Sequence, residues 1–456
     1  METNVAGPSN KSQDDSRHER PKGMTGFFYR LLAHYLSLYI RPEDRMVEVN
    51  PPSDKLRPYF EKYESLSVGG GEGGAQGARE LSRDDGGYFV LNSCIHYESD
   101  IQTLFDKLRG IVPDSGRVVI LYYSALWKPL ASVATRLGLR SKLPEQNWIS
   151  NEDVENLLNL SDFEVVRRDS KVLCPVHIPF LSALMNHYLA PLPGFRLFNM
   201  VNIVVARPLP KNDKVDRPSV SVVVPTRNES GNIENILRRC PKMGPDDELI
   251  FVEGNSTDDT WEKILEAAKT YTGPLRIVTT QQGGKGKGDA VRKGFSLATK
   301  EILMILDADL TMPPEDLPKF YRAIVTGKGE FINGSRLVYP MEKEAMRFFN
   351  ILGNKFFATA FSFVLNEKFK DTLCGTKVLT RGNYLRLAAN RSYFGEFDPF
   401  GDFDLIFGAA RLGLKIVEIP IHYRERTYGD TNIQRWKHGS ILLGMLIFAA
   451  RKIKFI

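Results

Sequence analysis

The sequence predicts two α/β domains in series, each built on a doubly wound sheet, and three observations lead to this prediction. Short apolar runs typical of strands alternate with helical patterns along most of the 456 residues. A proline-rich, charged segment at 207–218 interrupts the alternation, and its composition is typical of a linker. Hydrophobic residues make up 42% and charged residues 25% of the chain, the balance of a globular protein long enough for two or three domains.

The first domain is predicted at 26–206, after a polar tail at 1–25. The tail has no apolar segment like that of a signal peptide, and we expect it to be disordered. Helical patterns separate the apolar runs of the domain, which favours a parallel sheet. The expected strands are 46–49, 88–91, 117–121, 163–166 and 202–206.

The second domain is predicted at 219–430, with a separate tail at 431–456. Its apolar runs are again separated by helical patterns, which indicates a second doubly wound sheet. The expected strands are 220–224, 248–252, 275–278 and 302–306.

Composition argues against several classes of protein. The net charge of +6 is small for this length and gives no reason to expect a nucleic-acid partner. The four cysteines lie far apart, which disfavours a zinc site or a disulfide framework and leaves a reducing cytosol as the default. The longest apolar run, 441–450, is too short to cross a bilayer, so no membrane span is expected.

Two carboxylates follow the predicted strand at 302–306, and they are the first candidates for catalysis. Asp307 and Asp309 stand two residues apart at the end of this strand, where open α/β sheets bind ligands. Mg²⁺ or Mn²⁺ takes carboxylate oxygens together with substrate phosphates, so this pair is suited to hold a metal and a diphosphate. An Asx turn that caps the next helix is the alternative interpretation.

Three further segments accompany this pair in a fixed order: 220–229, 248–260 and 286–295. With the Asp-x-Asp pair they resemble the family 2 glycosyltransferases of GT-A fold, in the branch of dolichol-phosphate mannose synthases and polyprenyl-phosphate glycosyltransferases. The resemblance extends from about Ser219 to Tyr428. It implies metal-dependent transfer of a hexose from a nucleotide sugar, of GDP-mannose or UDP-glucose type, to a polyprenyl or dolichyl phosphate.

The resemblance also assigns residues to the donor. Arg227 and the pair Glu253-Gly254 depart from it, because the family usually has a tyrosine and two aspartates there, and the base of the nucleotide stays open. Independently, the start of a helix at Lys287 offers backbone amides and an ammonium to phosphate, with a solvated loop charge as the alternative. By resemblance the nucleoside is contacted by Pro225, Asn228, Glu229 and Glu253, and the diphosphate by Lys287 and Arg292.

The segments 333–336, 371–377, 401–404 and 418–429 resemble the acceptor half of the same branch. The acceptor phosphate is then expected at Arg336, Arg347 and Arg426, for which surface ion pairs are the alternative.

Two carboxylates in the acceptor half are further catalytic candidates. Asp402 and Asp404 are expected to orient the acceptor, or to act as base if the acceptor is a hydroxyl. An acidic first turn of a helix is the alternative. An anionic phosphate acceptor needs little deprotonation, so a strong base is dispensable. Cys374, in the same half, is expected to be a packed residue and not a nucleophile.

Two segments raise the possibility of membrane contact. The tail at 431–456 combines an apolar run with flanking basic residues, which predicts a basic amphipathic helix at an anionic membrane surface. A terminal helix packed on its own domain is the alternative. Phenylalanines between 350 and 369 are expected mainly in the core. The predicted location is cytoplasmic, peripheral on the cytoplasmic face of a membrane.

The first domain resembles a class I methyltransferase in the segments 46–54, 88–97 and 113–120. The resemblance covers about 29–206 and would imply an S-adenosylmethionine site. However, Asn50-Pro51-Pro52 stand where a glycine-rich turn would let the backbone approach the cofactor. We therefore expect a degenerate domain without a functional site. A non-catalytic interaction protein that docks a partner on this domain is the competing hypothesis to an enzyme.

Overall fold

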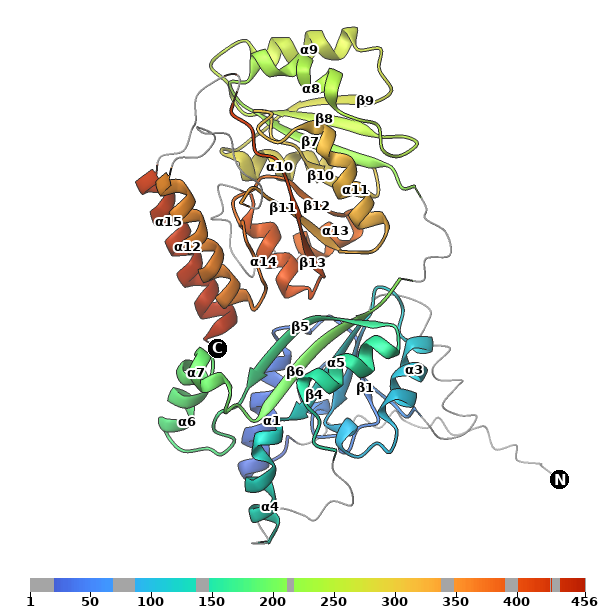
Figure 1. Cartoon of the computed structure of the whole chain (residues 1–456), viewed down its shortest axis with the longest axis vertical. Coiled ribbons are helices and arrows are strands. Elements are labelled where there is room, and N and C mark those ends of the chain that lie inside the picture. The colour runs from blue at the N-terminus through green and yellow to red at the C-terminus, as the bar shows by residue number, and fades with distance from the viewer. Residues whose placement is uncertain are drawn as a thin grey trace, which may run out of the picture.

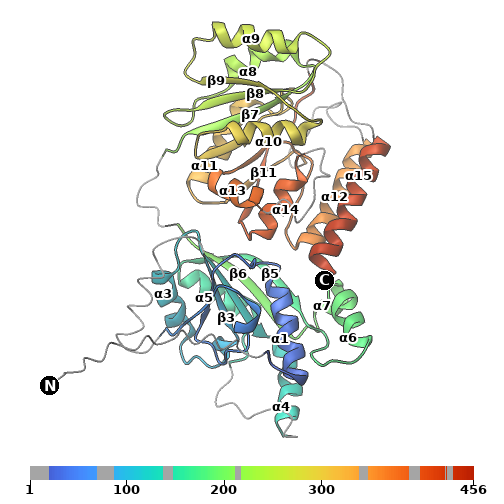
Figure 2. The same cartoon turned by 180° about the vertical axis from the view of Figure 1, so that it is seen from behind.

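A computed structural model describes most of the chain as two α/β units that follow one another (Figure 1 and, from behind, Figure 2). The predicted tail at 1–25 ends too late, because the first helix already begins at Gly23. The described residues are 20–68, 87–136, 147–210, 217–337, 348–389, 401–426, 428 and 435–455.

The N-terminal unit is a six-stranded sheet in the order β2-β1-β3-β4-β6-β5. The first four strands of this order are parallel, and β6 is antiparallel to both β4 and β5. Its strands are β1 (Met46–Val49), β2 (Tyr63–Leu66), β3 (Tyr88–Asn92), β4 (Arg117–Tyr123), β5 (Phe163–Lys171) and β6 (Val201–Pro208). Its α-helices are α1 (Gly23–Leu36), α3 (Ile101–Ile111), α4 (Lys128–Arg136), α5 (Asn151–Leu160), α6 (Leu181–Ala183) and α7 (Pro193–Arg196).

Alternation along the strands gives this sheet two buried faces. In β4, Val118 and Ile120 belong to the core under α3 and α5, whereas Val119 and Leu121 belong to the core under α1. Each such fully buried aliphatic side chain contributes about 1.5–3 kcal/mol. The sheet is therefore a layer between helices, as the sequence predicted.

The C-terminal unit is a seven-stranded sheet in the order β13-β11-β12-β10-β7-β8-β9. Its strands are β7 (Val220–Thr226), β8 (Glu248–Glu253), β9 (Arg276–Gln281), β10 (Ile302–Ile305), β11 (Phe331–Ser335), β12 (Lys377–Thr380) and β13 (Ile416–Pro420). Its α-helices are α8 (Ile233–Arg239), α9 (Thr260–Thr270), α10 (Lys287–Leu297), α11 (Leu317–Val325), α12 (Phe348–Leu365), α13 (Arg381–Ala389), α14 (Phe403–Arg411) and α15 (Arg435–Ala449).

Both sheets are mixed, which corrects the prediction of a parallel sheet in the first domain. β12 is antiparallel to β10 and β11, as β6 is to its neighbours. An apolar run with period two fixes which faces of a strand are buried, and it carries no information on strand direction. The nine predicted strands lie where they were expected, and among them only β6 is antiparallel to its neighbours. The strands β2, β11, β12 and β13 were not predicted.

The predicted tail at 431–456 is, over its described residues, part of the second unit. Leu442, Met445 and Ala449 of α15 are buried in the core that α10, α12 and α14 share. Figures 1 and 2 show α15 lying along α12. The alternative interpretation, a packed terminal helix, therefore holds for its buried face, while Leu443 and Ile447 remain exposed. Among the helices of the described ranges, none combines the length and the apolar character needed to span a bilayer.

A polar seam joins the two units. Arg117 donates from Nη2 to both carboxylate oxygens of Glu330 at 2.7 Å, and Lys415 pairs with Glu164 at 2.6 Å. Arg207, which the sequence assigned to a linker, is buried in β6 and donates to the carbonyl of Gly327 at 2.6 Å. The linker therefore begins later than predicted.

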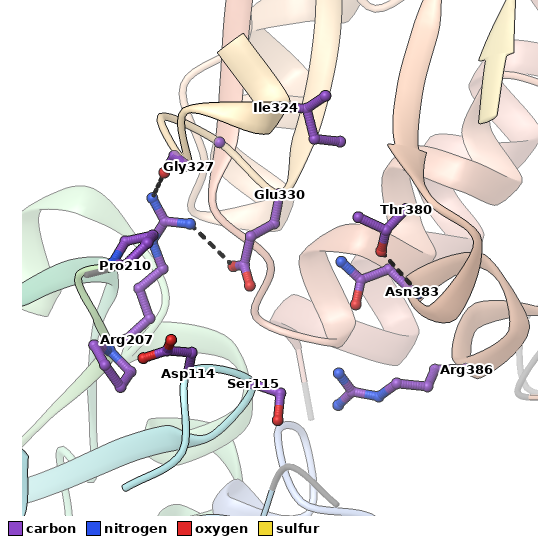
Figure 3. Close-up of a pocket in the computed structure, with 12 residues that line it drawn as sticks. Asp114, Ser115, Arg207, Pro210, Ile324, Gly327, Glu330, Thr380, Asn383 and Arg386 are labelled. Atoms are coloured by element: carbon purple, nitrogen blue, oxygen red, sulfur yellow. Dashed lines mark hydrogen bonds and ion pairs between the residues drawn. The ribbon is translucent and has the colours of Figure 1, made fainter. Parts of the chain in front are cut away.

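A cavity of about 250 Å³ lies on this seam (Figure 3). Its lining includes Ser115, which precedes β4, Glu330, which precedes β11, and Thr380, which ends the antiparallel β12. Glu330 and Thr380 belong to the edge of the second sheet at which its parallel strands begin. Ligands of such sheets bind at the opposite edge, where the strands end, so the active site is expected there.

Candidate active site

The carboxyl ends of β7, β8 and β10 lie side by side and carry several of the predicted donor residues. Asn228, after β7, has a φ of 55°, a conformation that asparagine tolerates better than most residues. Its backbone N–H donates to Ser256 Oγ at 3.0 Å, and its side-chain Oδ1 accepts from the backbone N–H of Thr257 at 2.8 Å. The buried Glu253, at the end of β8, accepts from the amide of Ser256 at 2.5 Å. Ser256 thus connects two of the residues assigned to the nucleoside.

Glu229 and Asp309, also from neighbouring strand ends, share one partner. Arg426 donates to Glu229 Oε1 at 3.1 Å and to Asp309 Oδ2 at 2.8 Å. Burial raises the pKa of Glu229 to about 7, which Arg426 opposes and the nearby Asp309 reinforces. An arginine that the sequence assigned to the acceptor therefore lies against donor-side carboxylates.

Lys287 and Asp307 form a second charged contact. Gly286, with a φ of 84°, precedes α10, and Lys287 at the first position of this helix places Nζ 2.5 Å from Asp307 Oδ1. Burial favours the neutral form of Asp307, but Lys287 holds the pKa of this carboxyl below its ordinary value. Likewise, Asp307 and Asp402 raise the pKa of Lys287 against the effect of burial. The lysine is paired and lies at the start of α10, so the alternative of a solvated loop charge does not describe it.

Gly375 is a site residue that the sequence analysis quoted only as part of a longer segment. A Cβ atom at this position would overlap both Asp307 Oδ2 and Lys287 Nζ. The absence of a side chain is therefore a condition for the ion pair. The signal in the sequence was a glycine within a segment assigned to the acceptor half, but nothing local indicated which groups it approaches.

Asp309 forms an Asx turn at the end of the strand. Its Oδ1 accepts from the amide of Thr311 at 3.1 Å and from Thr311 Oγ1 at 2.8 Å. The turn does not cap the following helices, which have no side-chain cap hydrogen bond, so the alternative interpretation holds only for the turn. Asp309 Oδ2 lies toward Arg426. The turn therefore orients the carboxylate at the strand end and does not exclude a ligand role.

Asp402 and Asp404 are each paired with a cation. Lys377 Nζ lies 3.2 Å from Asp402, and Arg292 lies 3.8 Å from Asp404. Asp402 immediately precedes α14 and Asp404 is in its first turn, so the alternative of an acidic helix start is also correct. Lys377, fully buried, is a further residue that the sequence analysis did not single out.

The three predicted acceptor arginines are not found together in the described residues. Arg336 makes a bidentate pair with the buried Asp371, at 2.7 and 2.9 Å. Asn354 donates to the same carboxylate at 3.0 Å. Arg347 lies outside the described residues, and Arg426 binds the donor-side carboxylates. The ion-pair alternative thus holds for Arg336, although the pair is largely buried and not on the surface.

The two aspartates after β10 fit a divalent cation whose remaining ligands come from the substrate. In the described ranges no three acidic, histidine or cysteine side chains form a metal-binding group. Asp307 and Asp309 alone supply hard carboxylate oxygens, and Mg²⁺ is commonly held by one or two carboxylates with water and substrate phosphates.

Comparison with known proteins decides the class of enzyme. Residues 221–384 match the family model described as glycosyl transferase family 2. The C-terminal unit is a family 2 glycosyltransferase domain. A dolichol-phosphate mannosyltransferase of Pyrococcus furiosus is 30% identical to this chain over 221 residues, which are 47% of this chain and 59% of that protein.

Two other similar proteins are more distant or shorter in overlap. An undecaprenyl-phosphate 4-deoxy-4-formamido-L-arabinose transferase of Klebsiella pneumoniae is 34% identical over 104 residues, 22% of this chain and 32% of that protein. A crystal structure of glucosyl-3-phosphoglycerate synthase from Mycobacterium tuberculosis with UDP is 18% identical, with a TM-score of 0.38, and covers 51% of this chain and 80% of that one. The chain thus spans less than two thirds of either transferase. The match to the glycosyltransferase family covers 221–384 of the second unit, and the methyltransferase resemblance of the first unit stays a prediction.

Proposed function

We propose that this chain transfers a hexose from a nucleotide sugar, of GDP-mannose or UDP-glucose type, to a polyprenyl or dolichyl phosphate. The observation that carries the proposal is the charged cluster of Lys287, Asp307 and Asp309 at the carboxyl ends of β10 and its neighbours. Two relatives of the domain are named for dolichol phosphate and undecaprenyl phosphate, which supports this class of acceptor.

The proposed roles follow the geometry of the strand ends. Pro225, Asn228, Glu229 and Glu253 would contact the nucleoside. Lys287, at the positive end of α10, would bind the diphosphate together with Arg292. Both cations already lie against carboxylates, so binding replaces one anionic partner with another.

A divalent cation, Mg²⁺ or Mn²⁺, would be held by Asp307 and Asp309 with the donor diphosphate. When bound, such a cation stabilises the negative charge that develops on the leaving diphosphate. The protein groups that act with it are Lys287, which would neutralise charge on the diphosphate, and Gly375, whose lack of a side chain leaves room for Asp307 and Lys287.

The acceptor step needs no strong base. An oxygen of the lipid phosphate attacks the anomeric carbon, the bond from this carbon to the diphosphate breaks, and the nucleoside diphosphate leaves with the electron pair. Arg336, Arg347 and Arg426 are proposed to hold the acceptor phosphate. A hydroxyl acceptor would require Asp402 or Asp404 as base, but each is neutralised by a cation, which favours the phosphate.

The remaining proposals concern the rest of the chain. We expect no functional S-adenosylmethionine site in the first unit, since Asn50 after β1 has its side chain bound to Val68 and Glu98. A docking role for this unit remains the alternative. The proposed location is the cytoplasmic face of a membrane, where a polyprenyl phosphate is accessible.

The test is transfer of labelled sugar to undecaprenyl or dolichyl phosphate, with a panel of nucleotide sugars and with Mg²⁺, Mn²⁺ or a chelator. Asp309→Asn is expected to abolish transfer and metal-dependent nucleotide binding, because too few hard ligands remain. Asp246→Asn is the matched control, since Asp246 precedes β8 and its side chain is 74% exposed. Unchanged transfer by Asp309→Asn, or transfer only to hydroxyl acceptors, would contradict the proposal.

A further inference from the structure

The N-terminal unit carries a group of exposed apolar side chains that do not pack in its core. They lie in the segment 176–198, which includes α6, the π-helix Leu184–Leu189 and α7. Phe180 is 93% exposed, Leu197 69% and Phe198 60%, in contrast to the buried Ser182 and Asn186 that hold the segment in place. Monomeric proteins rarely expose large apolar patches without a partner.

Hydrogen bonds to buried side chains fix the backbone of this segment, and the exposed side chains project from it. Asn186 accepts at Oδ1 from the amides of Leu173 and Cys174, both at 2.9 Å, and Asn199 donates to the carbonyl of Ala190 at 3.0 Å. Trp127 Nε1 donates to the carbonyl of Phe198 at 2.8 Å, which joins the start of α4 to the same surface. α4 itself exposes further apolar side chains outside this segment.

The same flank of the molecule continues into the glycosyltransferase domain. Figures 1 and 2 show α6 and α7 next to the C-terminal end of α15, which lies along α12. Arg196 in α7 donates to Asn366 Oδ1 at 3.3 Å, and Lys454 donates to the same oxygen at 2.5 Å. Exposed apolar side chains are found on both helices, such as Phe356 and Ile447.

The charge of this flank identifies its partner. Every one of these segments is free of acidic residues: none occurs between Asp169 and Asp213, between Asp114 and Glu145, between Glu344 and Glu367, or after Asp430. Basic residues occur in all of them, although the whole chain contains 55 acidic residues. Exposed apolar side chains in segments whose charged residues are all basic are suited to the interface of an anionic bilayer. A second copy of this chain would instead bring basic residues against basic residues.

We propose that the segment 176–198 of the N-terminal unit, with α4 and the exposed faces of α12 and α15, binds the surface of an anionic phospholipid bilayer. The N-terminal unit is then the main membrane-attachment element of the chain, and the tail is an extension of it. This inference goes beyond the proposed function and does not depend on which sugar or acceptor the enzyme uses.

The experiment is sedimentation of the full chain with vesicles of phosphatidylcholine alone or with phosphatidylglycerol. The wild type is expected to bind the anionic vesicles, less so at high salt. The double variant Leu184→Glu, Leu197→Glu is expected to bind about tenfold more weakly, because it removes apolar contacts and adds repulsive charge. The matched control is Leu160→Glu, Leu297→Glu, at positions that are 57% and 38% exposed in helices outside this flank. It is expected to bind like the wild type.

A second readout localises the contact. Tryptophan at Phe180 should be quenched by brominated lipid, and tryptophan at Leu160 should not. The proposal is overturned if the wild type ignores anionic vesicles, if the two double variants bind alike, or if the wild type is a dimer in solution that only the Leu184→Glu, Leu197→Glu variant dissociates.

The same proteins separate this inference from the proposed function. Transfer to a water-soluble, short-chain prenyl phosphate is expected to be equal in wild type and both double variants. If no transfer occurs at all while vesicle binding depends on Leu184 and Leu197, the proposed function fails and the membrane surface stands.

Discussion

Replacing Gly375 by alanine is expected to disable transfer while leaving the chain folded. The added methyl group would overlap Asp307 Oδ2 and Lys287 Nζ, which form an ion pair with Nζ 2.5 Å from Oδ1. Neither atom can keep its position, so both must move by about 1 Å to reach ordinary contact. The variant therefore tests whether the arrangement of this pair matters, without removing either charge.

The magnitude follows from what the displaced groups do. A misplacement of about 1 Å among groups that position substrate typically lowers the rate by about 10²-fold. Overpacking a site costs about 1–3 kcal/mol of folding stability. Both side chains of the pair are 29% exposed and have room to move, so we expect a cost near the lower end, about 1 kcal/mol.

The assay is initial-rate transfer of labelled sugar, with thermal unfolding of the same preparations. Gly382→Ala is the control, because a Cβ there meets nothing within 4 Å and alanine is favourable in α13. The control is expected to keep wild-type activity. If Gly375→Ala retained activity within about twofold of wild type, the pair of Lys287 and Asp307 would not be part of the catalytic arrangement.

Three further predictions address other charged groups and the first unit. Burial raises the pKa of Glu48 to about 7 in the folded chain, so folding takes up a proton between its ordinary pKa and about 7. Stability therefore falls as pH rises through this window. Glu48→Gln should remove up to about 3 kcal/mol of this pH-dependent loss of stability, measured by urea unfolding at pH 5 and 8. Although burial favours its neutral form, Arg336 holds the pKa of Asp371 at about 2, so its contribution is complete above its ordinary pKa and is lost as pH falls toward 2. Asp371→Asn should cost about 3 kcal/mol at pH 7, since it leaves a buried guanidinium without a counter-charge, and a cost below about 1 kcal/mol would contradict the assigned pair. Calorimetry of the full chain with S-adenosylmethionine should show weak or no binding, and tight, saturable binding would disprove the interpretation of the Asn50-Pro51-Pro52 turn.

The sequence predicted the position of nearly every long strand because buried strands of α/β sheets consist of apolar residues over their whole length. In β10, Leu303 and Ile305 are buried on one face and Ile302 and Met304 on the other, so no polar position interrupts the run. The antiparallel β12 was not predicted. Its Lys377 is a fully buried charge in a short strand, and its partner Asp402 lies 25 residues later in the numbering of the chain. A pattern of neighbouring residues cannot predict an ion pair between residues so far apart in the chain.

The sequence predicted which residues form the candidate site, but not which of them contact one another. Asp307, Asp309 and Lys287 were all identified, since a strand end and a helix start are visible in the sequence. That Arg426 contacts Asp309 depends on the path of the chain after β13, which only the tertiary structure supplies. The apolar flank of the N-terminal unit was missed for a related reason. Its segment looks like core in composition, and burial alone distinguishes an exposed Phe180 from a packed residue.

The pairing within the site has a consequence for how substrates bind. In the free chain Lys287 pairs with Asp307, and Arg426 pairs with both Glu229 and Asp309, so each carboxylate has a cationic partner. A cation alone would compete with these side chains for the aspartates, and a diphosphate alone would face carboxylates of its own sign. If the two arrived together, Asp307 and Asp309 would hold the cation, Lys287 would gain phosphate oxygens and Arg426 would keep Glu229, so that these charges would keep partners. Because only the joint exchange avoids an unpaired charge, the donor and the metal should bind as one unit, with each strengthening the binding of the other.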